Sequence, residues 1–345
     1  MKYTTLPNTD LKVSKICLGT MTWGEQNTEK EAHEQLNIAI ENGINFIDTA
    51  ELYAIPIKAE TQGLTEKYIG SWLKNQKRED LVIASKAAGP MPNLKHIRNI
   101  PNFSKEHIKQ AVEGSLTRLQ TDYIDLYQLH WPERITNFFG TLGYKHVDEE
   151  IQTNFKEILE TLKELIIEGK IRHIGLSNET PWGVMQFLKY AEECNLPRVI
   201  SIQNPYSLIN RVFEIGLAEF AMRENTPLLA YSPLGGGLLS GKYLKSNLPE
   251  GSRYQLYPNY FSRYKHGNTN LAVEAYNKLA KESGVSLTQL SLAFINSREF
   301  LLSNIVGATK IEQLKENIGS IEIELSKDVV NEIEKIHLLF PNPAP

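Results

Sequence analysis

The sequence predicts a (β/α)8 barrel, a closed ring of parallel strands surrounded by helices. Eight short, apolar, β-prone runs alternate with longer amphipathic runs along the 345 residues, and parallel neighbours need such helical crossovers. No low-complexity linker divides the chain, so one domain over residues 1–345 is expected. A doubly wound open sheet would show the same alternation, and it is the alternative that this pattern leaves open.

The expected strands are, in chain order, Ile16–Leu18, Ile44–Ile47, Leu81–Ala84, Ile124–Gln128, Ile174–Leu176, Val199–Ile202, Leu228–Tyr231 and Asn304–Val306. The clearest helices are expected at Glu29–Glu41, Ser104–Leu119, Thr153–Glu168 and Pro181–Glu193. Ser104 suits an N-cap, and Gly169 suits a helix stop. Two polar inserts, Pro132–Glu150 and Ser246–Asn268, should form long loops at the C-terminal face, where barrel enzymes build their active sites.

The composition is that of a soluble globular protein, with 41% apolar and 23% charged residues. A net charge of -4 argues against a nucleic-acid or anionic-membrane partner. The two cysteines, Cys17 and Cys194, lie in apolar segments, so neither a disulfide framework nor a thiolate metal site is expected. Without a signal pattern or an apolar run of about 20 residues, a cytoplasmic location is expected. The oligomeric state stays open, because no exposed apolar face can be identified from sequence.

Four side chains that can do chemistry follow the ends of three successive expected strands. Asp48 ends the second strand and Tyr53 lies five residues beyond it, in GINFIDTAELY; Lys86 follows LVIAS, and His130 follows LYQL. In a barrel these strands are neighbours, so the four groups should converge. Tyr53 could then act as a general acid toward a carbonyl oxygen, with its phenolate stabilised by Lys86, which Asp48 anchors. His130 would donate to the same oxygen and orient the carbonyl.

Each of these residues has a structural explanation when it is taken alone. Asp48 could be a turn residue, Tyr53 a packing residue and Lys86 a solvated lysine. His130, beside Trp131, could be a packed loop histidine. The placement of all four groups at three consecutive strand ends favours the functional interpretation.

Other chemistries are less well supported. The histidines show no HExxH or His-x-His spacing and the cysteines form no pair, so no metal is expected. There is no G-x-S-x-G elbow of a hydrolase. The dinucleotide fingerprint fails at Ser240, and the phosphate-loop pattern over residues 236–242 is followed by Tyr243 in place of Ser or Thr. Residues 235–237 are either a flexible turn or a backbone that approaches a pyrophosphate, with Lys242 as a point charge.

The motifs LGTMTWGEQN, GINFIDTAELY, ASK, DLYQLHWP, GKIRHIGLSN, IQNPYSL, YSPLGGGLLSGKY and IVGATKIEQLKENI resemble those of the aldo-keto reductase superfamily, most closely its bacterial Tas-like branch. The resemblance covers nearly the whole chain. It implies a (β/α)8 barrel that binds NADPH across its C-terminal face without a Rossmann domain. The family's catalytic four correspond to Asp48, Tyr53, Lys86 and His130. They imply hydride transfer from the nicotinamide to the carbonyl carbon, with Tyr53 as proton donor.

The resemblance also implies the residues that bind cofactor and substrate. The nicotinamide carboxamide would contact Ser177, Asn178 and Gln203, although Ser177 and Asn178 could also cap the next helix. Tyr231 would stack on the nicotinamide ring, and Trp131 would line the substrate pocket with Tyr53 and His130. The other implied cofactor contacts are Thr20, Met21, Asp48, Ser232, Leu234, Gly236, Lys242, Arg253, Gly307, Thr309, Lys310, Gln313, Glu316 and Asn317.

The last of these residues indicate NADP rather than NAD. The segment from Gly307 to Asn317 should begin a short helix whose N-terminal amides suit an anion, and Lys310 and Arg253 could add positive charge for the 2′-phosphate. The chain departs from many relatives here, which carry arginine where it has Thr309 or Lys310; a lysine lacks the bidentate fork of arginine.

Two functions remain in view. The first is NADPH-dependent reduction of an aldehyde or ketone to an alcohol. The second is a non-catalytic, NADP-binding regulatory subunit like the family's potassium-channel β-subunits, which typically carry asparagine at the position of His130. The insert Pro132–Glu150, with Phe138, Phe139 and Tyr144, should either wall the substrate pocket or pack its aromatic rings on the barrel. The insert Ser246–Asn268 should fold over the cofactor.

Overall fold

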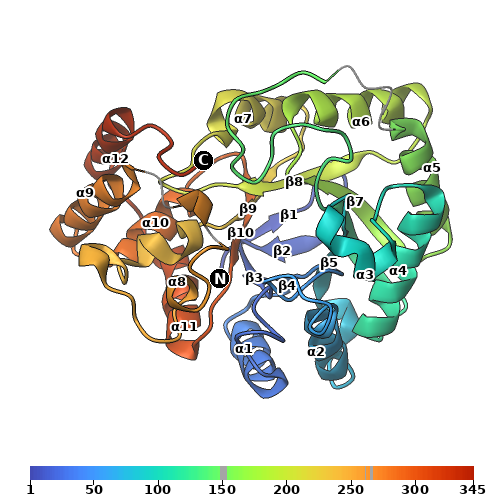
Figure 1. Cartoon of the computed structure of the whole chain (residues 1–345), viewed down its shortest axis with the longest axis horizontal. Helices are drawn as coiled ribbons and strands as arrows, with labels where there is room; N and C mark the ends of the chain where they lie inside the picture. The colour runs from blue at the N-terminus through green and yellow to red at the C-terminus, as the bar shows by residue number, and fades with distance from the viewer. Residues whose placement is uncertain (148–153, 261, 265–266) are drawn as a thin grey trace.

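The computed structural model describes residues 1–147, 154–260, 262–264 and 267–345. Among these residues, eight parallel strands close into a barrel in the order β10-β3-β4-β5-β6-β7-β8-β9, which Figure 1 shows at the centre of the molecule. The predicted barrel is confirmed and the open sheet is excluded. The strands are β3 (Ile16–Gly19), β4 (Phe46–Asp48), β5 (Val82–Ala87), β6 (Ile124–Leu129), β7 (Ile171–Ser177), β8 (Val199–Pro205), β9 (Leu228–Tyr231) and β10 (Leu301–Val306).

The second strand starts later than the sequence pattern predicts. The backbone N–H of Ile44 donates to the carbonyl of Ala39 at 2.9 Å, and Gly43 has a φ of 82°. Ile44 therefore belongs to the turn that ends the preceding helix, where glycine tolerates the left-handed backbone. The strand itself begins at Phe46.

An N-terminal hairpin that the sequence pattern did not predict closes the end of the barrel where the strands begin. It consists of β1 (Tyr3–Thr5) and β2 (Lys12–Ser14), which pair antiparallel. Leu6 and Val13 of this hairpin join the apolar cluster inside the barrel, together with Phe46 and other strand residues. The barrel is therefore open to a ligand at the C-terminal ends of the strands.

Helices surround the barrel and bury their apolar faces against it, in one large hydrophobic core. They are α1 (Glu29–Glu41), α2 (Leu64–Leu73), α3 (Lys95–Arg98), α4 (Lys105–Leu119), α5 (Phe155–Ile167), α6 (Pro181–Glu193), α7 (Phe213–Arg223), α8 (Arg253–Leu256), α9 (Thr269–Glu282), α10 (Leu287–Asn296), α11 (Ile311–Gly319) and α12 (Lys327–Leu339). The short 3₁₀ helices are η1 (Arg78–Asp80), η2 (Pro92–Leu94), η3 (Gly235–Ser240), η4 (Leu244–Ser246), η5 (Ser262–Tyr264) and η6 (Ser320–Glu322). No helix in the described ranges is long and apolar enough to cross a membrane.

Local sequence signals explain several helix ends. Thr28 and Glu31 form a reciprocal capping box at the start of α1. The side chain of Ser104 caps α4, as predicted. Asn154 caps α5, which ends at Ile167 just before Gly169 adopts a φ of 74°; Thr153, the predicted start of this helix, lies outside the described residues.

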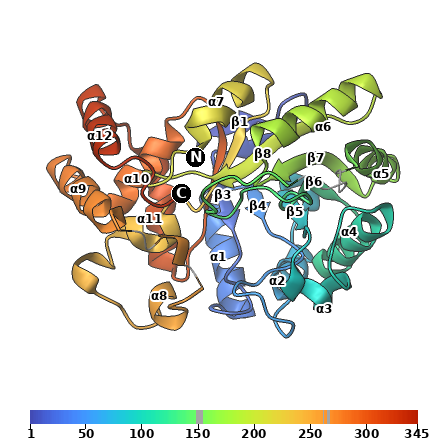
Figure 2. The same ribbon diagram turned by 45° about the horizontal axis from the view of Figure 1, so that its top comes forward.

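The two predicted inserts are long connections at the C-terminal face. The first follows β6, and in Figure 2 it passes in green in front of the barrel strands; its residues 148–150 lie outside the described part. The second is more structured than predicted, because it contains α8 and η5; residues 261, 265 and 266 are not described. Both inserts lie where they can border a site at the mouth of the barrel.

Candidate active site

A buried ion pair joins the ends of β4 and β5. The parallel register places Asp48 of β4 opposite Ala84 of β5, and Lys86 lies two residues further along β5. Lys86 Nζ lies 2.6 Å from Asp48 Oδ2 and donates to the carbonyl of Thr49 at 2.8 Å. The Lys86 side chain has no exposed surface. Burial lowers the pKa of Lys86, but Asp48 and Tyr53 outweigh that effect and the net pKa is raised, which keeps the ammonium charged.

Tyr53 lies next to this pair. Lys86 Nζ is 5.1 Å from the centroid of the Tyr53 ring. Burial raises the pKa of Tyr53 and Lys86 opposes the rise by Coulomb attraction, with a net pKa above the ordinary phenol value. The phenol is therefore protonated at neutral pH, while the group that would stabilise its phenolate is already in contact.

His130 completes the cluster from the end of β6. Its ring centroid lies 5.8 Å from that of Tyr53 and 4.9 Å from that of Trp131. Burial, and then the charge of Lys86, lower the pKa of His130 well below its ordinary value, so the imidazole is neutral. Its Nδ1 is buried and has no hydrogen-bond partner among the described residues. The four strand-end side chains therefore meet at one place, as their spacing predicts.

A cavity of about 500 Å³ opens above this cluster, within the size range of small-molecule sites. All the predicted site residues line the cavity except two. Lys86 is fully buried behind Tyr53, and Lys310 is exposed outside the cavity. The predicted residues that line it are Thr20, Met21, Asp48, Tyr53, His130, Trp131, Ser177, Asn178, Gln203, Tyr231, Ser232, Leu234, Gly236, Lys242, Arg253, Gly307, Thr309, Gln313, Glu316 and Asn317.

The amides near His130 are held by the protein itself. Asn178 Nδ2 donates to the carbonyl of His130 at 2.8 Å, and Asn178 Oδ1 accepts from Tyr231 Oη at 2.6 Å. The alternative that Ser177 and Asn178 cap the next helix is wrong, because Thr180 caps α6. These bonds fix the carboxyl ends of β7 and β9 around the cavity.

The far end of the cavity gathers positive charge. Burial, and then Arg253 and Lys310, lower the pKa of Lys242, as expected for like charges held close together. Residues 235–237 all have positive φ, within the tight turn of η3. A Cβ on Gly236 would lie 2.8 Å from both Tyr254 and Tyr264, so only glycine brings the backbone this close. Cations and close backbone around a hollow fit the phosphates of a dinucleotide.

The model of the aldo/keto reductase family matches residues 15–338. The chain belongs to the aldo/keto reductase family. The predicted resemblance is therefore confirmed, and the protein is an oxidoreductase whose family uses nicotinamide dinucleotides.

Three relatives show how far the similarity extends. The chain is 50% identical over 347 residues to "Protein tas" of Escherichia coli K12, with the whole of both chains aligned. It is 34% identical over 347 residues to the uncharacterized oxidoreductase YrpG of Bacillus subtilis, covering all of this chain and 97% of that one. It is also 30% identical over 344 residues to a probable voltage-gated potassium channel subunit beta of rice, covering 97% and 96%.

The first insert of this aldo/keto reductase combines both predicted alternatives. Phe139 lines the cavity and also packs on Trp131, with ring centroids 5.7 Å apart. Phe138 packs on Phe139 at 5.0 Å. Tyr144 is 64% exposed and does not line the cavity. One aromatic of the insert thus borders the cavity, while the others pack behind it or face solvent.

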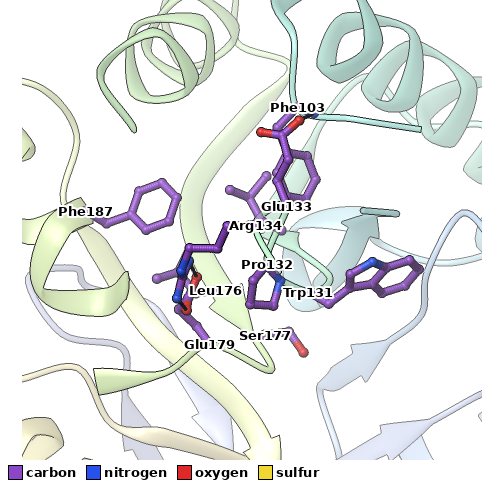
Figure 3. A pocket seen from close by; sticks show the side chains of 10 residues that line it. Phe103, Trp131, Pro132, Glu133, Arg134, Leu176, Ser177, Glu179 and Phe187 are labelled. Atoms are coloured by element: carbon purple, nitrogen blue, oxygen red, sulfur yellow. Dashed lines mark hydrogen bonds and ion pairs between the residues drawn. The ribbon is translucent and has the colours of Figure 1, made fainter. Parts of the chain in front are cut away.

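An ion pair anchors the start of this insert. Arg134 Nη1 donates to Glu179 Oε2 at 3.0 Å, and Figure 3 shows the guanidinium lying against that carboxylate beside Pro132. The indole Nε1 of Trp131 donates to the carbonyl of Pro90 at 3.1 Å. These contacts connect the loops after β5, β6 and β7 and hold the Trp131 wall in place.

Sequence reasoning missed several residues of the site. Gln128 contacts Asp48 inside the barrel, and the cavity is also lined by Gln26, Ile55, Ile57, Met91, Tyr260 and Arg263. The signal for Gln128 was a polar residue in the apolar run LYQL. Tyr260 and Arg263 belong to the insert Ser246–Asn268, which is expected to fold over the cofactor, whereas the other loop residues carried no comparable signal. Within the described ranges, no group of three or more His, Cys, Asp or Glu side chains could hold a metal ion.

Proposed function

We propose that the protein reduces an aldehyde or ketone to an alcohol in the cytoplasm, with NADPH as cofactor and Tyr53 as proton donor. One observation carries the proposal. The Lys86 ammonium, buried against Asp48 at 2.6 Å, lies 5.1 Å from the ring centroid of Tyr53 at the wall of a cavity of about 500 Å³. A phenol beside a buried cation is suited to give up a proton to a developing alkoxide.

The proton donor works through its two neighbours. Tyr53 keeps its proton at neutral pH, as an ordinary phenol does, and burial raises its pKa further. When the proton leaves, the Lys86 charge stabilises the phenolate, and Asp48 keeps that charge in position. Positioned general acids of this kind contribute about 10²- to 10⁴-fold to the rate.

His130 supplies a neutral donor toward the same carbonyl oxygen. Its lowered pKa leaves one ring nitrogen protonated, and the unpartnered, buried Nδ1 is better tolerated as an acceptor than as an unpaired N–H. The proton therefore belongs on Nε2. Trp131 and Phe139 would hold the body of the carbonyl compound.

The dinucleotide would be held along the cavity. Gln203, Ser177 and Tyr231 would hold the nicotinamide end, which supplies the hydride for the carbonyl carbon when NADPH is bound. Gly236, Lys242 and Arg253 would hold the phosphates. The predicted contacts from Gly307 to Asn317 would hold the adenosine end. Lys310 lies outside the cavity lining, but its charge acts on Lys242, and it supports a preference for NADP because the 2′-phosphate adds negative charge.

A second candidate is a nucleotide-binding subunit without catalytic activity. The similarity to the rice protein described as a probable potassium channel subunit beta supports it. His130 favours the enzyme, because such subunits typically carry asparagine there.

Purified protein mixed with NADPH and either 4-nitrobenzaldehyde or methylglyoxal separates the two functions. The enzyme should consume the nicotinamide absorbance, and Tyr53→Phe should abolish consumption while leaving NADPH binding intact. Tyr144→Phe is the matched control, because this exposed tyrosine lies outside the cavity. NADPH binding without turnover on any carbonyl would favour the subunit and overturn the proposed activity.

A further inference from the structure

Gln128 is a buried amide at the centre of the site that the proposed mechanism does not use. It lies on β6, opposite Lys86 on β5 and Gly175 on β7, and has no exposed surface. An amide in the interior of a barrel destabilises the fold unless its polar atoms find partners. Its partners are therefore informative.

Three side chains form a closed set of hydrogen bonds. Gln203 Nε2 donates to Asp48 Oδ1 at 2.8 Å and to Gln128 Oε1 at 3.2 Å. Gln128 Nε2 donates to the same Asp48 Oδ1 at 3.3 Å. Both N–H groups of Gln203 are thus directed into the barrel.

The chemistry of Asp48 decides which way both amides point. As the ion-pair partner of Lys86, Asp48 is a carboxylate that only accepts hydrogen bonds. Both glutamines must therefore turn their nitrogens toward it. Gln203 lines the cavity, and no described residue donates to its Oε1. Gln203 consequently presents a carbonyl oxygen, and no N–H, to the cavity.

We propose that Gln128 is a positioning residue that holds the Gln203 oxygen toward the cavity, so that the site selects a ring substituent carrying an N–H donor. This rests on the proposed function, in which that substituent is the nicotinamide carboxamide. Loss of the Gln128 oxygen leaves one buried N–H of Gln203 unpaired. Asp48 Oδ1 still accepts the other N–H, so the amide turns about that hydrogen bond until the freed N–H reaches the cavity, and the selection is lost.

Calorimetry with two cofactors tests the proposal. NADPH is compared with its reduced 3-acetylpyridine analogue, whose acetyl group lacks the amide N–H. The unmodified protein should bind NADPH about three- to tenfold more tightly, the worth of one hydrogen bond. Gln128→Met should bring this ratio close to one, even if both affinities fall. Gln203→Met should do the same, and the double variant should add nothing further.

Two further variants keep the test decisive. Gln128→Asn retains a buried amide but is one methylene too short to reach Gln203, so it should also lose the selection. This variant tests the proposal if the methionine variant does not fold. Ser303→Ala removes a buried hydroxyl on β10 that donates to the carbonyl of Ser14, away from the cavity, and should keep the full ratio. A ratio that survives in both Gln128 variants, or is absent from the unmodified protein, overturns the inference alone. Failure of the unmodified protein to bind NADPH overturns the proposed function as well.

Discussion

Replacing Lys86 by methionine tests the site most directly. The side chain is fully buried, and its Nζ contacts Asp48 Oδ2 at 2.6 Å and the carbonyl of Thr49 at 2.8 Å. Methionine is similar in length and apolar, so the change removes the positive charge without opening a large cavity. Asp48 is left buried without its counter-ion.

The structure sets the size of both effects. Removing one partner of a buried pair costs about 3–5 kcal/mol, and the amides that still donate to Asp48 Oδ1 keep the loss near the lower end. At about 2.1 cal/mol/K per residue, the 345-residue chain has an unfolding entropy of about 0.7 kcal/mol/K. The melting temperature should therefore fall by about 4 °C. The rate of carbonyl reduction should fall by about 10²- to 10⁴-fold, because the phenolate of Tyr53 loses its stabilising charge.

Thermal unfolding and steady-state reduction of 4-nitrobenzaldehyde measure the two effects separately. The double variant Asp48→Asn, Lys86→Met removes both charges, so it should unfold at a higher temperature than Lys86→Met yet stay inactive. Lys189→Met is the matched control, because this lysine is exposed on α6 and, among the described residues, pairs with Glu193 alone, at 3.9 Å. A Lys86→Met rate within tenfold of the unmodified protein, or a double variant no more stable than the single one, would refute the reasoning.

Three further predictions concern the cavity. Lys242→Met should weaken NADPH and NADH alike, each about tenfold, because this half-buried lysine would hold the pyrophosphate that both cofactors carry and a charged hydrogen bond is worth about 1.5–3 kcal/mol. Equilibrium binding of both cofactors measures this, with the exposed Lys245→Met as control; a loss confined to NADPH would contradict the assignment. Deleting residues 137–144, or the single change Phe139→Ala, should lower kcat/KM for an aromatic aldehyde about tenfold through lost apolar contact; an equal loss of NADPH affinity would count against a substrate wall. The pH profile of reduction should show no inflection near about 6.5, because the lowered pKa of His130 keeps it neutral. Activity should fall only in alkaline solution, as the raised pKa of Tyr53 is passed and the phenol loses its proton; an inflection near neutrality would contradict this assignment.

Much of the fold followed from short-range pattern. The alternation of apolar and amphipathic runs located every strand of the barrel, and the cap at Ser104 appeared where its side-chain chemistry predicts it. The four chemical residues were found by their position after strands. These features depend on residues close together in the chain, so periodicity and capping rules reach them.

Other features could not be predicted from pattern. The hairpin that closes the barrel floor consists of two strands of three residues each, too short to show a clear period. Phe139 and Tyr144 belong to one insert, yet only Phe139 lines the cavity. Which side chain of a loop faces a cavity depends on backbone turns that composition does not encode.

The sequence by itself determined the alternation of strands and helices and the identity of the four strand-end groups, because both are written in local residue patterns; that alternation left the closed barrel and the open sheet as alternatives. Only the tertiary structure decided how those groups are held. Asp48 meets Gln128 and Gln203 across sequence separations of 80 and 155 residues. Lys310, just before α11, comes close enough to Lys242, just after η3, for the two charges to interact. Closure of the strands into a ring creates these contacts, and the orientation of each buried amide then follows from which neighbour can accept its N–H groups.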